Sequence, residues 1–129
     1  MAERQWTVEF HDDFDAEFDA MDEDVQDALL AAAKALQRLG PLAGRPYVDA
    51  LSGSKHANMK ELRFDAKNGA EVWRAAFAFD PDRSAIVLTA GAKQGQNQSL
   101  FYKRLIKKAD ARFDQHLEAL SAARKSKRK

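Results

Sequence analysis

The stretch MKELRFDAKNGAEVWRAAFAFD, residues 59–80, contains two strand patterns separated by a turn signal. In both halves apolar residues alternate with charged or small ones, and this period of two is typical of strands with two different faces. Between the halves, Asn68-Gly69 is a dipeptide that favours tight hairpin turns. The stretch therefore predicts an antiparallel hairpin with strands at 59–64 and 71–79.

The rest of the chain places helical and strand patterns on both sides of this hairpin. On the N-terminal side, apolar residues at helical spacings predict two helices, and Gly40-Pro41 ends the second. On the C-terminal side, Asp80-Pro81 marks a turn before another strand, and a long apolar stripe predicts a closing helix. The expected elements are strands at 6–10, 59–64, 71–79 and 85–92, helices at 13–20, 23–39 and 100–123, and a loop at 41–58 with an extended piece near 47–51.

This order of elements predicts an α+β fold. We expect a two-layer sandwich in which a small, mostly antiparallel sheet (β-α-α-β-β-β-α) carries all of the helices on one face. With 129 residues the chain is long enough for one domain with its own core, which we place at residues 1–123. The remaining stretch RKSKRK, residues 124–129, is too polar to pack and is expected to be a disordered basic tail.

Composition excludes several kinds of site. The chain has no cysteine, which rules out disulfides, thiolate zinc sites and cysteine nucleophiles. The three histidines are scattered, and no phosphate-loop or dinucleotide spacing is present, so we expect no metal and no cofactor. The sequence shows no secretory signal pattern and no run near the roughly 20 apolar residues of a membrane span. The expectation is a soluble cytoplasmic protein.

The small net charge of +1 conceals a strong asymmetry. Residues 1–27 hold eleven Asp or Glu and one Arg, whereas the remaining residues hold twenty Lys or Arg and nine Asp or Glu. An acidic segment joined to a basic body indicates two different partners or intramolecular neutralisation. The alternative is an acidic helix that is simply solvated beside a moderately basic surface.

Strand alternation gathers four charged residues on the face opposite the apolar residues. Glu61 and Arg63 lie on one strand, Arg74 on the next, and Lys93 at the end of the last. Because neighbouring strands lie about 4.8 Å apart, these groups could converge on one phosphate-sized ligand. Arginine forks match phosphate oxygens and lysine supplies a point charge. The alternative is that Glu61 or Glu71 forms ordinary cross-strand ion pairs with the arginines, each worth roughly 0.2–1 kcal/mol.

Four segments of the chain, taken in order, resemble the RelE/ParE superfamily of type II toxins, in particular its HigB-like, phage-derived branch. These segments are ELRF, VWRAAFAFD, AIVLTAGAKQG and FYKRLIKKADARFDQHL. The resemblance extends from Trp6 to about Leu120. It implies a small toxin that acts as a ribosome-dependent mRNA endoribonuclease (mRNA interferase), inhibits translation, and is neutralised by a helix-turn-helix antitoxin. By position, Arg63, Arg74 and Lys93 match the basic residues that grip the RNA backbone in such enzymes.

This resemblance implies a metal-independent reaction in which the RNA 2′-hydroxyl attacks the adjacent phosphate. Arg63 and Arg74 would neutralise the charge that develops in the transition state, and Lys93 would assist the leaving 5′-oxygen or hold the backbone. Glu61 or His56 would accept the proton, a task to which a histidine is suited near neutral pH.

Other residues are assigned to RNA binding. Lys55, His56 and Lys60 stand just before or at the start of the first hairpin strand. Many RNA-cleaving members of the superfamily carry Tyr or His near the end of the last strand, where this chain reads AKQGQN. Tyr102 could substitute for it, with Lys103 in the same basic flank. Two other functions stay open: a ParE-like inhibitor of DNA gyrase, and a non-catalytic module that binds nucleic acid or protein. The oligomeric state is not predicted.

Overall fold

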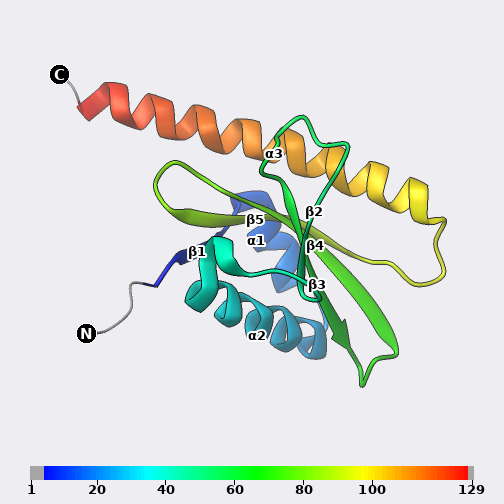
Figure 1. Ribbon diagram of the computed structural model, residues 1–129. Coiled ribbons are helices and arrows are strands. Elements are labelled where there is room, and N and C mark those ends of the chain that lie inside the picture. Colours follow the sequence, from blue (N-terminus) through cyan, green and yellow to red (C-terminus); the bar gives the residue numbers. More distant parts are fainter. Residues whose placement is uncertain (1–4, 128–129) are drawn as a thin grey trace.

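The computed structural model describes residues 5–127, in which five strands form one sheet with the order β1-β5-β4-β3-β2 (Figure 1). β1 runs parallel to β5, and the other neighbouring strands are antiparallel, so the expected α+β fold with a mostly antiparallel sheet is confirmed. The elements are β1 (Thr7–Phe10), α1 (Asp12–Asp19), α2 (Glu23–Leu39), the 3₁₀ helix η1 (Gly40–Leu42), β2 (Val48–Ala50), β3 (Lys60–Ala66), β4 (Glu71–Phe79), β5 (Ser84–Ala92) and α3 (Gln98–Lys127).

The helices cover both faces of the sheet, and the expectation of a two-layer sandwich with all helices on one face is wrong. Figure 1 shows α2 on one side of the sheet and α3 on the other. Phe14 of α1 and Leu29 of α2 lie in a buried cluster with Phe77 of β4. Leu88 of β5 belongs to a second cluster, with Phe113 of α3. The reason is that β4 and β5 carry apolar residues on both faces, and each apolar face requires a cover.

A β-bulge in β5 decides which residues of this strand share a face. The pairing of β5 with β4 skips Leu88, which is the extra residue. As a result Val87 and Ala90 belong to the α1/α2 cluster or pack against it, whereas Ile86 and Leu88 belong to the α3 cluster. Strict alternation predicts that Ile86, Leu88 and Ala90 share one face, and this prediction is wrong because the bulge separates Ala90 from the other two. The bulge also puts Lys93, three positions after Ala90, on the α3 face.

One arginine joins the two helical layers across the edge of β5. β1 pairs with β5 only as far as Val87, and within residues 5–127 no strand continues this edge. Arg112 of α3 donates from Nη1 to the carbonyl of Leu88 at 2.8 Å. Its Nη1 and Nη2 also donate to the two carboxylate oxygens of Glu17 in α1, at 2.8 and 2.6 Å. This bidentate pair ties α1, β5 and α3 together.

The turn after α2 depends on a glycine. Gly40 has φ of +55°, a conformation that side chains with a Cβ rarely adopt. The indole of Trp6 packs directly over it and would collide with a Cβ at this position. The backbone N–H of Trp6 also donates to the carbonyl of Gln37 at 2.8 Å. These contacts fix the start of β1 against the end of α2.

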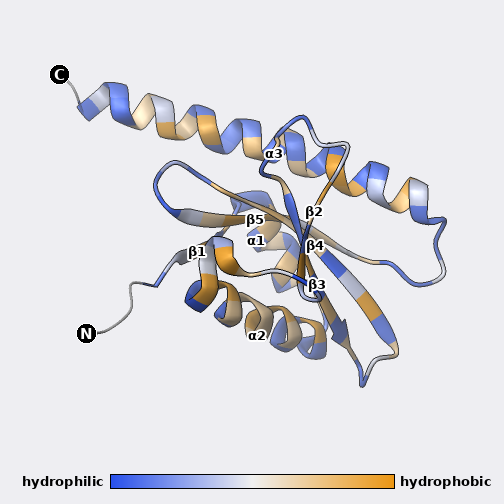
Figure 2. Ribbon diagram, in the orientation of Figure 1, coloured by the Kyte–Doolittle hydropathy of each residue, from blue (hydrophilic) through white to orange (hydrophobic). Residues whose placement is uncertain are grey.

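α3 is longer than expected. Its buried residues recur every four positions, and Figure 2 shows hydrophobic and hydrophilic residues alternating along it. The helix continues to Lys127, so residues 124–127 are helical rather than disordered, and residues 128–129 lie outside the described part. Lys and Arg are good helix formers that also suit the C-terminal end of a helix dipole. No helix in the described residues is long and apolar enough to cross a membrane.

Candidate functional site

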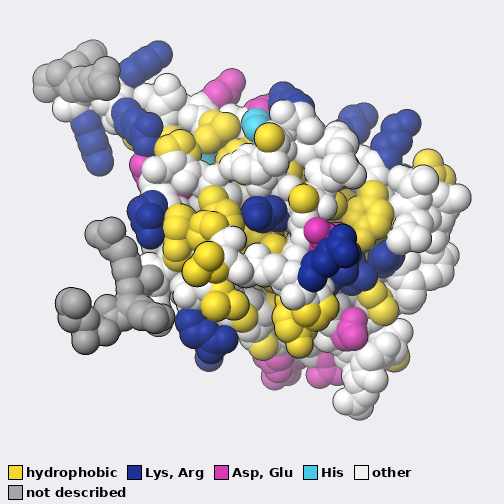
Figure 3. Space-filling model, viewed as in Figure 1, with side chains coloured by type: hydrophobic (Ala, Val, Ile, Leu, Met, Phe, Trp, Pro, Cys, Tyr) yellow, Lys and Arg dark blue, Asp and Glu magenta, His cyan; other side chains and the backbone are white. Residues whose placement is uncertain are grey.

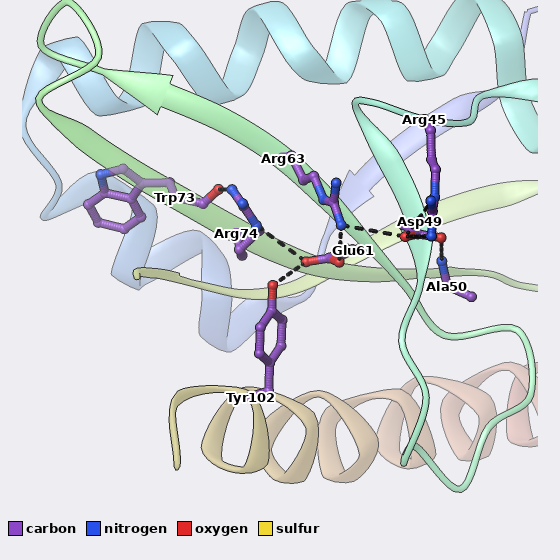
Figure 4. Close-up of polar contacts among 8 residues, drawn as sticks. All are labelled: Arg45, Asp49, Ala50, Glu61, Arg63, Trp73, Arg74 and Tyr102. Atoms are coloured by element: carbon purple, nitrogen blue, oxygen red, sulfur yellow. Dashed lines mark hydrogen bonds and ion pairs between the residues drawn. The ribbon is translucent and has the colours of Figure 1, made fainter. Parts of the chain in front are cut away.

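A buried carboxylate, that of Glu61 in β3, lies at the centre of a charged cluster on the α3 face (Figure 4). Its side chain is 6% exposed. Arg63 donates from Nη2 to Oε2 at 3.2 Å, and the hydroxyl of Tyr102 donates to Oε1 at 2.8 Å. Nε of Arg74 lies 3.4 Å from Oε1, close enough for an ion pair. Side chains from β3, β4 and α3 therefore converge on one carboxylate.

The two arginines stand directly opposite each other on β3 and β4. Like charges in this position repel, and the carboxylate of Glu61 between them offsets the repulsion. Arg74 is held more tightly: its side chain is 12% exposed and donates from Nη1 to the carbonyl of Trp73 at 2.9 Å. Arg63 is 35% exposed, and its Nη2 also reaches Oδ2 of Asp49 in β2 at 3.4 Å.

Each of the two guanidinium groups has one nitrogen, Nε, without a hydrogen-bond partner in the described residues. Nε of Arg63 and Nε of Arg74 are buried and have no hydrogen-bond partner in the described part of the chain. The 3.4 Å approach of Arg74 to Glu61 is thus an ion pair without hydrogen-bond geometry at Nε. Buried polar groups in proteins are nearly always paired, so these two nitrogens are exceptions to the usual pattern.

A groove of about 970 Å³ opens beside the cluster, between the segment that follows β2 and the first turns of α3. It is lined by Glu61, Arg63, Lys93, Tyr102 and Lys103, among others. Lys93, just after β5, and Lys103, near the start of α3, thus add positive charge to the groove that Arg63 of β3 lines. Figure 3 shows Lys and Arg side chains gathered around an acidic one on this face of the molecule.

Burial and neighbouring charges shift the pKa of two side chains that line the groove, Lys93 and Tyr102. Burial lowers the pKa of the Lys93 ammonium, and the nearby positive charges of Arg74 and Arg63 lower it further, with Glu61 opposing. Burial raises the pKa of the Tyr102 hydroxyl, as does its hydrogen bond to Glu61. Nζ of Lys93 lies 5.4 Å from the centre of the Tyr102 ring, within reach of a cation–π interaction. Tyr102 is therefore a hydrogen-bond donor at neutral pH.

The structure brings most of the predicted site residues together. The groove and the cluster behind it contain Glu61, Arg63, Arg74, Lys93, Tyr102 and Lys103. Arg74 does not line the groove itself and contacts it through Glu61.

Three residues that we assigned to RNA binding do not line this groove. Lys55 and His56 both pair with Asp114 of α3, the imidazole Nε2 at 2.8 Å from its Oδ1. Lys60 alternates with Glu61 along β3 and therefore points to the other face of the sheet. The positions of these residues in the chain, just before the strand, gave no information about the face or the helix that they meet.

Three further charged residues lie at the site and were not predicted from the sequence. Asp49 stands opposite Glu61 in the pairing of β2 with β3 and holds Arg63. Lys107 and Asp110 of α3 line the groove. The signal for Lys107 was its spacing of four from Lys103 on one helix face, and the short β2 offered no comparable signal.

The fold belongs to a known class. The crystal structure of the archaeal RelE–RelB complex from Pyrococcus horikoshii OT3 contains a chain that superimposes on this one with a TM-score of 0.51. The match covers 70% of this chain and 98% of the other, at 12% sequence identity. At that identity the likeness defines the RelE-type α+β fold.

Sequence comparison then gives the family. The model of the family described as Phage derived protein Gp49-like (DUF891) matches residues 16–114, and the chain belongs to this family. It is 39% identical over 124 residues to a candidate toxin named HigB2 from Mycobacterium tuberculosis (strain ATCC 25618 / H37Rv), a match that covers 96% of this chain and 60% of HigB2. It is 40% identical over 100 residues to a candidate toxin of the same organism named HigB3, covering 78% of this chain and 83% of HigB3.

Proposed function

We propose that this chain is the toxin of a type II toxin–antitoxin system and that it inhibits translation in the cytoplasm by cleaving mRNA on the ribosome. The relatives named as toxins and the RelE-type fold support the class. The observation that carries the chemistry is the pair of arginines opposite each other on adjacent strands, held by Glu61 at a groove lined by Arg63, Lys93 and Lys103. Such a set of cations fits a phosphodiester backbone.

In the proposed reaction no metal takes part. The 2′-hydroxyl of the RNA forms a bond to the adjacent phosphorus, the bond to the 5′-oxygen breaks, and the product ends in a 2′,3′-cyclic phosphate. Arg63 and Arg74 stabilise the negative charge that builds up on the phosphate oxygens. Lys93 gives a proton to the leaving 5′-oxygen, which suits a lysine whose pKa is lowered by burial.

The two proton acceptors suggested by the sequence fit this reaction poorly. His56 lies outside the groove, where it pairs with Asp114. Glu61 lines the groove, but its two oxygens already accept from Arg63 and Tyr102 and face Arg74. In our proposal the proton of the 2′-hydroxyl passes to water in the open groove.

The proposal includes two kinds of partner. The mRNA and the ribosome are the targets, and a helix-turn-helix antitoxin neutralises the toxin. Support for an antitoxin comes from the neighbouring structure, which is that of a RelE–RelB complex. The acidic residues of α1 and α2 offer the complementary charge for basic residues of such a protein.

The test is to express the wild type, Arg63→Ala and Arg74→Ala and to map cleavage of a translated mRNA by primer extension. Loss of either guanidinium should lower cleavage at least about 100-fold and relieve growth inhibition, because Arg63 lines the groove and Arg74 adds its positive charge to the same site from behind Glu61. Arg38→Ala is the matched control, since Arg38 is an exposed arginine of α2. Full cleavage by Arg74→Ala would refute this assignment of the site. Altered plasmid supercoiling and an SOS response without mRNA cleavage would instead indicate a gyrase inhibitor.

A further inference from the structure

We infer that Glu61 is a positioning residue: it holds Arg63, Arg74 and Tyr102 in place for the RNA phosphate while its own charge opposes phosphate binding. The inference rests on the proposed function for the class of substrate. It differs from the role of proton acceptor, and it predicts that removing the charge tightens RNA binding and slows cleavage. These two effects have opposite directions, which makes them separable from simple damage to the fold.

Hydrogen-bond donors of the protein already contact both oxygens of the Glu61 carboxylate. Oε2 accepts from Arg63 at 3.2 Å, while Oε1 accepts from Tyr102 at 2.8 Å and faces Nε of Arg74 at 3.4 Å. Glu61 is only 4% exposed, so little of its carboxylate surface is open to the groove. A proton acceptor needs a lone pair directed at the substrate hydroxyl. Here the protein's own donors occupy the carboxylate.

The two arginines need a counter-charge. Arg63 and Arg74 are direct cross-strand partners, and Lys93 adds a third positive charge to the same space. Asp49 supplies a second carboxylate for Arg63, but the ion pairs of Arg74 within the described residues include only Glu61. The position of Arg74 therefore depends on Glu61 more than that of Arg63 does.

The negative charge of Glu61 also acts on a ligand in the groove. Glu61 lines the groove, so a phosphate that reaches Arg63 comes within a few ångströms of the carboxylate. Two negative charges at such a distance repel appreciably even at high dielectric. Replacement by the uncharged glutamine removes this repulsion and should lower the Kd for RNA roughly 5- to 10-fold.

The loss of position acts on the reaction in the opposite sense. The amide of a glutamine presents N–H groups as well as an oxygen and carries no charge, so it cannot accept from Arg63 and Tyr102 on two oxygens and also pair with the Arg74 cation as the carboxylate does. Arg74 then loses its ion-pair partner next to the carbonyl of Trp73. Because a displacement of about 1 Å in a catalytic group can cost roughly 100-fold in rate, Glu61→Gln should cleave 10- to 100-fold more slowly.

The experiment measures binding and cleavage on the same preparations. Binding uses a fluorescently labelled, uncleavable 2′-O-methyl RNA oligonucleotide and fluorescence anisotropy at fixed salt, because salt alone changes such affinities strongly. Cleavage uses single-turnover kinetics on ribosomes that carry a defined mRNA. We expect Glu61→Gln to bind more tightly and cleave more slowly. Glu61→Asp keeps the charge but is one methylene shorter, so it should bind like the wild type and cleave more slowly.

Asp65→Asn provides the matched control. Asp65 lies on β3, on the same face of the sheet as Glu61 by strand alternation, and it is exposed. Its substitution changes the net charge by the same amount as Glu61→Gln, and we expect both binding and cleavage to remain as in the wild type. A tighter binding by Asp65→Asn equal to that of Glu61→Gln would show a general charge effect and would overturn the inference.

A third measurement separates this inference from the proposed function. The Nε–H signals of Arg63 and Arg74 in NMR spectra report the mobility of the guanidinium groups without any RNA. We expect the Arg74 signal to be sharp in the wild type and broadened in Glu61→Gln. If the wild type fails to cleave mRNA, the proposed function is wrong while this measurement still decides the positioning role. An unchanged Arg74 signal, or weaker RNA binding by a folded Glu61→Gln, would refute the inference.

Discussion

The two faces of the sheet are built from the same strands and have different uses. On the α1/α2 face, aromatic and aliphatic residues from both helices and from β3, β4 and β5 form one buried cluster. On the other face, α3 covers a smaller cluster, and beyond it β3 and β4 carry Glu61, Arg63 and Arg74. The first face is covered by apolar packing that stabilises the fold. On the second face α3 packs over only part of the sheet, and a charged groove lies beside the rest.

The difference lies in what β3 and β4 present on each side. Leu62 and Phe64 belong to the first face, whereas the residues between and beside them are charged and belong to the second. Since neighbours along a strand point to opposite faces, one short segment serves both purposes. A substitution on one face should therefore leave the structure of the other face largely unchanged.

The largest effect is expected from Phe77→Ala on the α1/α2 face. Phe77 is fully buried, and truncation of a buried phenylalanine typically costs about 3–5 kcal/mol of unfolding free energy. The folded fraction should retain cleavage, since Phe77 points away from the groove. Denaturant unfolding and activity per folded molecule check this.

Phe101→Ala is the counterpart on α3: it removes the ring packed on Tyr102, so cleavage should fall. Equal activity of the two variants would contradict the separation of the faces.

Arg112→Ala should have an intermediate effect, because Arg112 is the contact that links the two faces. It loses a bidentate pair with Glu17 and leaves the carbonyl of Leu88 unpaired, at a cost of about 1–3 kcal/mol. Lys108→Ala is the control, since Lys108 lies 3.9 Å from the same carboxylate and is exposed. Thermal unfolding of both variants compares them, and similar midpoints would show that the link contributes nothing beyond a surface ion pair.

The sequence predicted the elements of the site better than the cover of the sheet. The alternation around Leu62 and the Asn68-Gly69 turn are local signals, and both specify the β3–β4 hairpin that opposes Arg63 to Arg74. The second covered face was missed, although the continuous apolar run AIVL in β5 is typical of a strand buried on both sides. Which helix covers which face depends on tertiary packing and has no local signal.

The placement of Lys93 illustrates the limit of strand alternation. Strict alternation predicts Lys93 on the same face as Val87, but Val87 belongs to the α1/α2 cluster. Lys93 still reaches the groove because the bulge at Leu88 reverses the alternation after that point. No residue in the run marks the bulge, since Leu88 fits a regular strand equally well. The partnership of Lys55 and His56 with Asp114 is likewise set by the packing of a loop on α3.

A smaller effect is expected from Tyr102→Phe, which tests the contact between α3 and the charged face. It removes the hydroxyl that donates to Glu61 at 2.8 Å and leaves the ring in place. The net loss should be about 1 kcal/mol of unfolding free energy, the usual value for one hydrogen bond. Cleavage should fall less than in Glu61→Gln, because Arg63 and Arg74 keep their carboxylate. A reduction as large as that of Glu61→Gln would give Tyr102 a direct part in the reaction.

The smallest effect is expected on the pH dependence of stability, through the pair of Glu17 in α1 with Arg112. The hydrogen bond and charge of Arg112 hold the pKa of Glu17 below its usual value of 4.5. A carboxyl whose folded pKa is lowered adds stability above its unfolded pKa, and this contribution disappears as the pH falls through the folded pKa. Because the Glu17 side chain is 39% exposed, solvent screens the pair and the contribution should stay below about 1 kcal/mol. The wild type should therefore exceed Glu17→Gln in stability at pH 7, and the difference should shrink below about pH 4.5.

Urea unfolding of both proteins at a series of pH values around pH 4.5 measures this difference in stability, with Asp19→Asn as the exposed α1 control. A difference that persists undiminished at low pH would mean that the side chain acts by packing and that the charge of the Arg112 link does not join the two faces.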